Sequence, residues 1–224
     1  MQFFKPFTYF IRKPGGFMNV LCGCVCVLIP VIGPIILLGY RAEVAEALEK
    51  DPDLEDYPDF DFNRFMEYLT RGVWPFLAEL VVTLVAWLLM GVAVGVGFAV
   101  GAATNEWMYG VLAGAVLLVP VTIVTMLLMW PMELYTQLSG GFNFGAAVRF
   151  TFQFLGRMWG QMLIAALVFG FLSTLLSFAG LLACIIGVYP AAVIQSLAQQ
   201  HYVAQLYRHY LDEGGEPIPV PTTK

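Results

Sequence analysis

Two long apolar runs separated by a very short connection constrain this chain more than any other feature. The first covers Phe76 to Ala103 and the second covers Met108 to Met132. About 20 mostly apolar residues suffice to cross the hydrocarbon core of a bilayer, so each run predicts a membrane-crossing helix. Only residues 104–107 join the two runs, and we therefore expect a tight helical hairpin.

A third apolar stretch, from Trp159 to Leu197, is about twice the length of one crossing. Ser177 and Gly180 lie near its middle and predict a turn there, which makes a second hairpin. The whole chain is 59% hydrophobic and only 12% charged, whereas soluble domains average about 45 to 50% and about 25%. This composition predicts an all-α, polytopic membrane protein.

The first apolar run, Leu21 to Tyr40, has two interpretations. It forms either a re-entrant hairpin that turns at Pro30, Gly33 and Pro34, or one crossing that is kinked at the prolines. Each arm of the hairpin has about 13 residues, or about 20 Å, which is short of a full crossing. The hairpin leaves all 11 Lys and Arg on one side of the membrane. Cytoplasmic flanks collect these residues, so the charge count favours the hairpin.

Three segments are similar in composition: Phe7 to Phe17, Phe65 to Trp74 and Phe150 to Trp159. Each is rich in aromatic residues and carries an arginine before a bulky aromatic. We therefore predict one domain, 1–212, made of three hairpin-like repeat units, each opened by an interfacial amphipathic helix. The alternative is that aromatics and arginines gather at any membrane interface. The units cover residues 1–40, 65–135 and 136–212, with an acidic cytoplasmic loop at 41–64 and a flexible tail at 213–224.

Nine of the 16 carboxylates lie between Glu43 and Asp61. Their spacing does not fit a calcium loop, because Asp56 stands where the glycine is needed and Phe62 where the bidentate glutamate is needed. A solvated linker, a weak cation patch and a docking surface for a basic partner remain open. The candidates for an interaction surface are Asp51, Asp53, Glu55, Asp56, Asp59 and Asp61.

The sequence offers little for catalysis or metal binding. Cys22, Cys24 and Cys26 are spaced two apart and cannot converge on one ion while helical. No nucleophile elbow, glycine-rich phosphate loop or paired histidine motif occurs in the sequence. It also lacks a basic patch of the kind that binds nucleic acid. We expect no enzyme activity, no cofactor and no metal.

Glu79 is the one carboxylate inside a predicted crossing. Ionisable groups at membrane depth are functional candidates, but Glu79 lies near the start of its run. We therefore expect it to pair with Arg71 or Arg157 and so join the second and third units.

Glycines recur at four-residue spacing along the predicted hairpin, a pattern that lets helix backbones approach closely. The expected role is packing within the hairpin, and self-association is the alternative. The residues are Gly91, Gly95, Gly97, Gly101, Gly110 and Gly114.

Two motifs carry a family resemblance. The proline-rich run that closes in Gly39-Tyr40-Arg41, together with the stretch from Tyr57 to Gly72, resembles the prokaryotic membrane family catalogued as domain of unknown function 4013. The stretch from Ala179 to Tyr207 extends the resemblance, which covers most of residues 7–212. It implies an integral membrane protein of bacterial type and no established activity or catalytic residue.

Two functions follow from this reading. The first is a non-catalytic scaffold or assembly component of the bacterial inner membrane, with its loops and C-terminus in the cytoplasm. Its partners would be the lipid bilayer and either another protein or further copies of the chain, and not nucleic acid. The second is a small transporter or channel that uses the broken first hairpin, since discontinuous helices often line substrate sites. The scarcity of polar groups in the apolar runs favours the scaffold.

Overall fold

The structure is a computed structural model that describes residues 3–12, 14–51, 57–141, 143–183 and 186–220. These residues form helices and connections only, which confirms the all-α prediction. The elements are α1 (Lys5–Arg12), α2 (Pro14–Leu28), α3 (Ile32–Lys50), the 3-10 turn η1 (Phe62–Arg64), α4 (Phe65–Thr104), α5 (Trp107–Ser139), α6 (Phe144–Leu182) and α7 (Val188–Asp212). Three of them, α4, α5 and α6, are long and apolar enough to cross a membrane.

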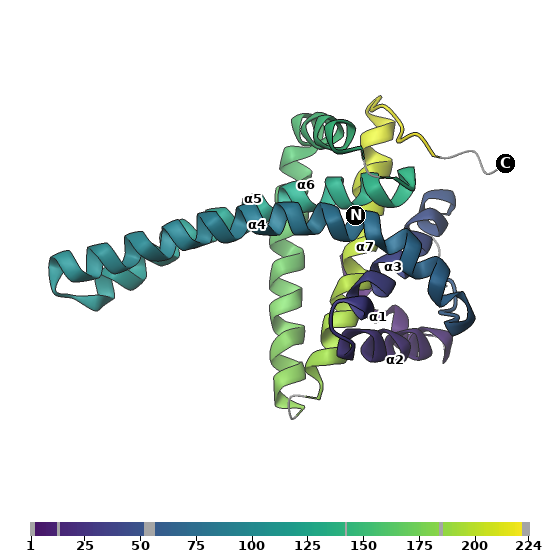
Figure 1. Cartoon of the computed structure of the whole chain (residues 1–224), viewed down its shortest axis with the longest axis horizontal. Coiled ribbons are helices and arrows are strands. Elements are labelled where there is room, and N and C mark those ends of the chain that lie inside the picture. The colour runs from purple at the N-terminus through teal and green to yellow at the C-terminus, as the bar shows by residue number, and fades with distance from the viewer. Residues whose placement is uncertain (1–2, 13, 52–56, 142, 184–185, 221–224) are drawn as a thin grey trace.

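Helices α4 and α5 form the predicted tight hairpin (Figure 1). The chain reverses at Asn105, whose backbone is left-handed with φ 55°, and α5 begins two residues later. We call residues 83–125 the arm, because Val82 and Met126 are the last residues on either side that pack against the main core. Figure 1 shows the arm projecting away from the other helices.

Four of the six predicted packing glycines hold the arm together. A Cβ at Gly97 would lie 2.8 Å from the carbonyl oxygen of Gly110, and one at Gly101 would lie 3.0 Å from the Trp107 ring. Gly114 lies against Gly97 in the same contact. A Cβ at Gly91 or Gly95 would meet nothing within 4 Å, so these two glycines lie on the open side of α4.

The hairpin of α6 and α7 turns later than the sequence predicts. Helix α6 continues through Ser177 and Gly180 and ends at Leu182, so the predicted position of the turn is wrong. Gly180 serves a different purpose, since a Cβ there would lie 2.7 Å from the carbonyl oxygen of Gly187 at the start of α7. The glycine permits close helix contact beside the turn, and Ser177 accepts a hydrogen bond of 2.9 Å from Gln195 of α7.

The first apolar run is broken into α2 and α3. The break covers Ile29 to Val31, and Val31 has a positive φ of 64°. Of the predicted turn residues, only Pro30 lies in the break, whereas Gly33 and Pro34 lie in the first turn of α3. Proline is tolerated there because its missing N–H has no helical partner at that position. Gly33 lets the two helices meet, since a Cβ there would lie 1.6 Å from the carbonyl oxygen of Cys26.

The three predicted units are not visible as copies of one fold. Only the first segment gives a separate helix, α1, whereas Phe65 to Trp74 and Phe150 to Trp159 are continuous with α4 and α6. In Figure 1 both long helices bend in their N-terminal parts. In α4 the bend has a ready cause in Pro75, which removes a backbone donor inside the helix.

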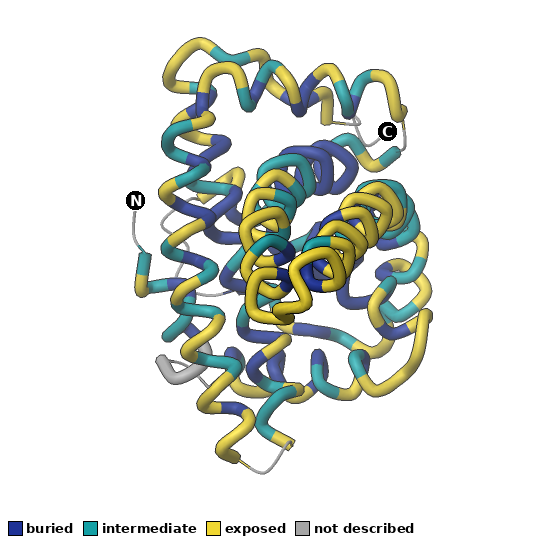
Figure 2. Tube along the Cα trace, turned by 90° about the vertical axis from the view of Figure 1, so that its left-hand side faces the viewer, coloured by how far each residue is buried: buried dark blue, intermediate teal, exposed yellow. Residues whose placement is uncertain are grey.

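Two clusters of buried side chains share α7. One contains Trp130, Phe154 and Tyr202 of α5, α6 and α7, and the other contains Ile36 and Tyr68 of α3 and α4 together with residues of α2 and α7. Figure 2 shows buried residues where the helices converge and exposed residues along the arm, which points toward the viewer.

The C-terminal segment was predicted to be a flexible tail, yet its described part packs on α7. Ile218 is 4% exposed and belongs to the first core cluster. Its N–H donates to the Tyr207 hydroxyl at 2.8 Å, and the Glu216 N–H donates to the Tyr210 hydroxyl at 3.2 Å. The apolar side chain of Ile218 explains this packing.

Candidate functional site

A cluster of buried polar side chains lies where α3, α4, α5 and α7 meet. Arg41 of α3 is 6% exposed, and its Nη2 lies 2.7 Å from Oε1 of Glu133 on α5, which is 2% exposed. Its Nη1 lies 3.8 Å from Oε1 of Glu79 on α4. A buried charge is tolerated only when it is paired, so these contacts account for the burial of Arg41.

Three glutamines complete this cluster. Gln200 of α7 accepts hydrogen bonds through Oε1 from Arg41 Nε at 3.3 Å and Nη2 at 3.1 Å, and its own amide donates to Gln137. Gln137 donates to Glu133 at 2.6 Å, and Gln199 donates to the other Glu133 oxygen at 3.0 Å. We call Arg41, Glu79, Glu133, Gln137, Gln199 and Gln200 the Arg41 cluster.

The Arg41 cluster brings one cation against two carboxylates. Glu133 has a short contact with Arg41 and two glutamine donors, whereas Glu79 has only the longer contact. The Glu79 side chain is 29% exposed, against 3% for that of Glu133. Glu133 is therefore the carboxylate that compensates the buried guanidinium, and Glu79 forms the open edge of the cluster.

The expected partners of Glu79 are wrong. Arg71 pairs with Glu46 and lies 3.8 Å from Glu67, and Arg157 donates to the carbonyl oxygen of Glu213 at 2.8 Å. Arg71 is eight residues from Glu79, or about 12 Å along the helix, which is too far for a pair. The close packing of α3 on α4 supplies Arg41 instead.

That close packing depends on two glycines. A Cβ at Gly39 would lie 1.8 Å from the carbonyl oxygen of Tyr68, and a Cβ at Gly72 would lie 1.7 Å from that of Ile35. Both contacts are with backbone, which cannot move aside as a flexible side chain can. The two positions bring the backbones of α3 and α4 together, next to Tyr40 and Arg41.

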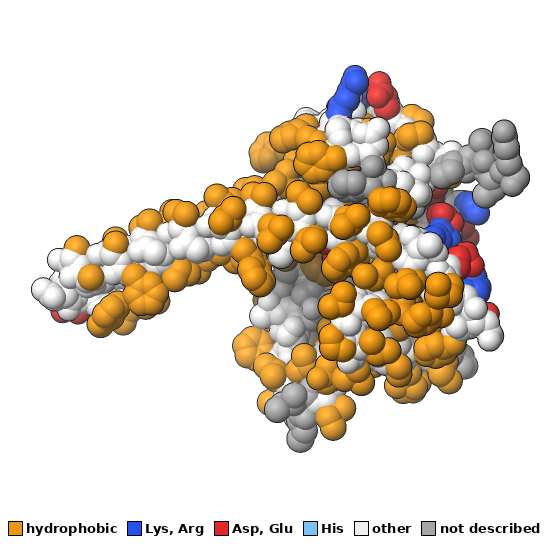
Figure 3. All heavy atoms as spheres, viewed as in Figure 1, with side chains coloured by type: hydrophobic (Ala, Val, Ile, Leu, Met, Phe, Trp, Pro, Cys, Tyr) orange, Lys and Arg blue, Asp and Glu red, His pale blue; other side chains and the backbone are white. Residues whose placement is uncertain are grey.

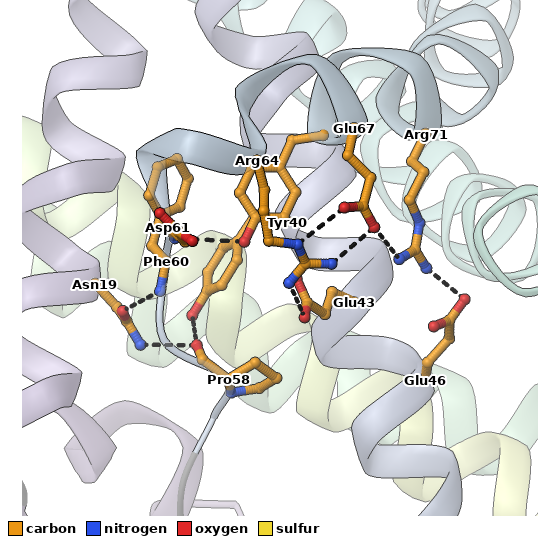
Figure 4. A network of polar contacts seen from close by, with 11 residues as sticks. Asn19, Tyr40, Glu43, Glu46, Pro58, Phe60, Asp61, Arg64, Glu67 and Arg71 are labelled. Carbon is orange, nitrogen blue, oxygen red and sulfur yellow. Dashed lines mark hydrogen bonds and ion pairs between the residues drawn. The ribbon is translucent and has the colours of Figure 1, made fainter.

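Figure 4 shows a second polar network at the outer end of the same helix pair. Arg64 contacts Glu43 of α3 at 2.6 Å and Glu67 of α4 at 2.7 Å, and Arg71 contacts Glu46 of α3. The side chains of Arg64 and Glu67 are 35% and 47% exposed. Solvent screens such pairs, so they orient α4 on α3 and contribute little to stability.

Part of the acidic segment is docked against the helices (Figure 4). Asn19 of α2 donates to the Pro58 carbonyl oxygen at 3.1 Å and accepts from the Phe60 N–H at 2.8 Å. Tyr40 also donates to the Pro58 carbonyl oxygen, at 2.8 Å. Tyr57 and Phe60 are buried, so residues 57–61 form an anchored strap across α2 and α3.

The Tyr57 hydroxyl lies 3.2 Å from His201 Nδ1 of α7. Burial raises the pKa of Tyr57, so its hydroxyl stays protonated and can donate to that nitrogen. This contact joins the strap to the helix that also carries Gln199 and Gln200.

The acidic interaction candidates divide into three groups. Asp53, Glu55 and Asp56 lie outside the described residues. Asp51 and Asp59 are exposed, whereas Asp61 accepts hydrogen bonds from Asn63 at 2.9 and 2.8 Å and caps η1. Asp59 and Asp61 therefore belong to a fixed segment of the surface.

The cysteines are packing residues in the described part of α2. Cys22 and Cys26 are buried and Cys24 is half-buried, and all three are free thiols. Cys184 lies outside the described residues. Within the part of the chain that the structure describes, no group of three His, Cys, Asp or Glu side chains converges as a metal site would require.

Comparison with known proteins gives a family and nothing further. The model of a family described as a protein of unknown function, DUF4013, matches residues 22–197. No curated protein and no solved structure matches the chain.

Proposed function

The chain belongs to the DUF4013 family, whose function is unknown, and we propose that it is a non-catalytic membrane scaffold or assembly component. The observation that carries this proposal is the arm, whose outer side chains are large, apolar and uncovered. Trp87 is 67% exposed, Leu88 73% and Val116 69%. Apolar helices of this length suit a lipid bilayer, and they leave the charged end of the molecule to meet a partner.

The proposed membrane placement follows from where the charges lie. Apart from acidic atoms at the tip of the arm, Figure 3 shows the charged side chains at the top and right of the molecule, away from the length of the arm and from the lower part of α6. Figures 1 and 2 show the arm and that part of α6 crossing at a steep angle. If the charged side faces the cytoplasm of a bacterium, both the arm and the α6–α7 hairpin descend obliquely into the inner membrane, with their turns on the other side.

The first hairpin fits this placement as a re-entrant element. Helix α2 has 15 residues, about 22 Å, and is too short to cross. It presents exposed apolar side chains, among them Phe17, Leu21 and Leu28. Its covered side packs on α3 and α7, as backbone at membrane depth requires. The chain also has three successive helix pairs, α2–α3, α4–α5 and α6–α7, and we still propose that they are three related units.

The Arg41 cluster supports a structural rather than a catalytic role. Its guanidinium and its glutamine amides bond to one another and to Glu133. A site for a reacting substrate would need polar groups aimed at open space. The cluster joins four helices. A scaffold whose part outside the membrane has only a small core needs such a connection.

One observation favours the second candidate, a transporter or channel. The Arg41 cluster places charged groups among the spans, where ionisable residues often mark ion or substrate paths. Glu79, at its open edge, is the residue that such a path would use.

Purification in mild detergent followed by mass spectrometry separates the two functions. For the scaffold, we expect a partner to co-purify in stoichiometric amount. Its binding should be weakened by Asp59→Lys, on the charged side, and retained in Glu106→Lys, at the exposed tip of the arm. A chain that runs alone and takes up solute or conducts ions in liposomes, with the flux lost in Glu79→Gln, would establish the transporter instead.

A further inference from the structure

A groove of about 640 Å³ lies between α5 and α6, on the inner side of the angle between the arm and the α6–α7 hairpin. Leu118, Thr122 and Met126 line it at four-residue spacing on α5, and residues between Ala166 and Leu181 line it on α6. Ligand sites in proteins commonly measure about 300 to 1,000 Å³. The groove therefore has the size of a binding site for one small molecule.

Three of the four hydroxyl side chains that line the groove already make hydrogen bonds. The Thr122 hydroxyl donates to the Leu118 carbonyl oxygen at 2.9 Å, and the Thr174 hydroxyl donates to that of Gly170 at 2.8 Å. Ser177 bonds to Gln195. The Ser173 hydroxyl has no partner but is buried beneath the wall. The groove consequently offers hydrocarbon contact and no recognition of a polar head.

The rim of the groove is continuous with the surface that the two spans turn outward. Val119 is 60% exposed, Phe171 64% and Phe178 62%. In a membrane these side chains face acyl chains, and an apolar groove that opens beside them does not hold water.

The length and the lining of the groove favour an acyl chain as the occupant. Ala166 to Leu181 covers about 22 Å of α6, which is more than the ~15 Å of hydrocarbon in one leaflet of a bilayer. The apolar lining offers an acyl chain contact along that length. We propose that this groove binds one acyl chain of a membrane phospholipid. The inference rests on the membrane placement proposed above and is independent of the scaffold role.

Two glycines of α6 provide a filling variant and its control. A Cβ at Gly170, in the groove, would meet nothing within 4 Å, and the same holds at Gly160, which does not line the groove. Gly170→Leu therefore fills the groove without a clash, and Gly160→Leu adds the same side chain elsewhere on the helix. Equal melting temperatures of the two variants would show that both are folded.

The test uses the full chain in liposomes that contain a phospholipid with a photoactivatable diazirine in its acyl chain. We expect labelled residues to concentrate on the groove faces of α5 and α6 and to saturate as the probe fraction rises. That excess should be lost in Gly170→Leu and kept in Gly160→Leu. Labelling no stronger than on the exposed face of the arm, or unchanged in Gly170→Leu, would overturn the proposal, as would cross-links between two copies through the groove. A partner or flux measurement decides the scaffold separately, so the two proposals fail independently.

Discussion

Removing the guanidinium of Arg41 should destabilise the protein more than any surface change. Arg41→Met keeps the length of the side chain but leaves Glu133, which is 2% exposed, without its cation. At the observed 2.7 Å and an effective dielectric constant of about 20, the lost attraction is about 6 kcal/mol before desolvation is counted. Breaking a buried pair from one side typically costs about 3 to 5 kcal/mol, which we adopt as the expected loss.

A double-mutant cycle separates the coupling free energy of the Arg41–Glu133 pair from the effect of changing each side chain alone. In Arg41→Met with Glu133→Gln, no uncompensated charge stays buried, so the double variant should be more stable than Arg41→Met alone. Unfolding in mixed micelles, followed by the intrinsic fluorescence of the five tryptophans, of which Trp130 is buried, gives the free energies. For a chain of this size the expected loss corresponds to a fall in melting temperature of roughly 6 to 20 °C.

Additive losses in this cycle would refute the reasoning. If Arg41→Met and Glu133→Gln each destabilised and the double variant lost their sum, the two side chains would not be coupled. A change of under about 1 kcal/mol for Arg41→Met alone would likewise place the pair in solvent rather than in the core.

Three further changes test other contacts. Glu79→Gln should change stability by about 1 kcal/mol or less, because its contact with Arg41 is longer and partly exposed, and a loss as large as that of Arg41→Met would contradict the division of roles within the cluster. Gly39→Ala should destabilise the protein by more than about 3 kcal/mol, because its Cβ would overlap the Tyr68 carbonyl. In the same unfolding assay Gly91→Ala, whose Cβ lies in open space, should be neutral or should stabilise the protein by up to about 1 kcal/mol. Asn19→Ala should speed hydrogen exchange of residues 57–61, since both of its bonds to that segment are lost, while Asn63→Ala should leave that exchange near wild type.

The helices were largely predictable because hydrophobic length is a local property. The runs from Phe76 to Ala103 and from Met108 to Met132 determine α4 and α5, and the four residues between them determine the hairpin. The late turn of α6 and α7 was not predictable, because a glycine in an apolar sequence is compatible both with the end of a helix and with close packing of a neighbouring helix. Gly180 allows close packing, which is evident only from its contact with Gly187.

The Arg41 cluster was missed for a similar reason. Arg41 and Glu133 each lie at the edge of an apolar run, where charged residues usually meet water. The available signal was Glu133 four residues before Gln137, together with the two adjacent glutamines at 199 and 200. Polar residues at helical spacing inside a span indicate a buried network, but they do not say which distant cation completes it.

The shortness of the connection at Asn105 has a consequence for the membrane placement proposed above. With Gly97 against Gly110, the two helices of the arm meet within a few residues of their junction. In that placement the two helices would enter the bilayer together, as one preformed hairpin. Glu106 is the only charged residue among residues 83–125, so it is the only charge of the arm whose transfer to the far side would add to the free-energy cost of insertion.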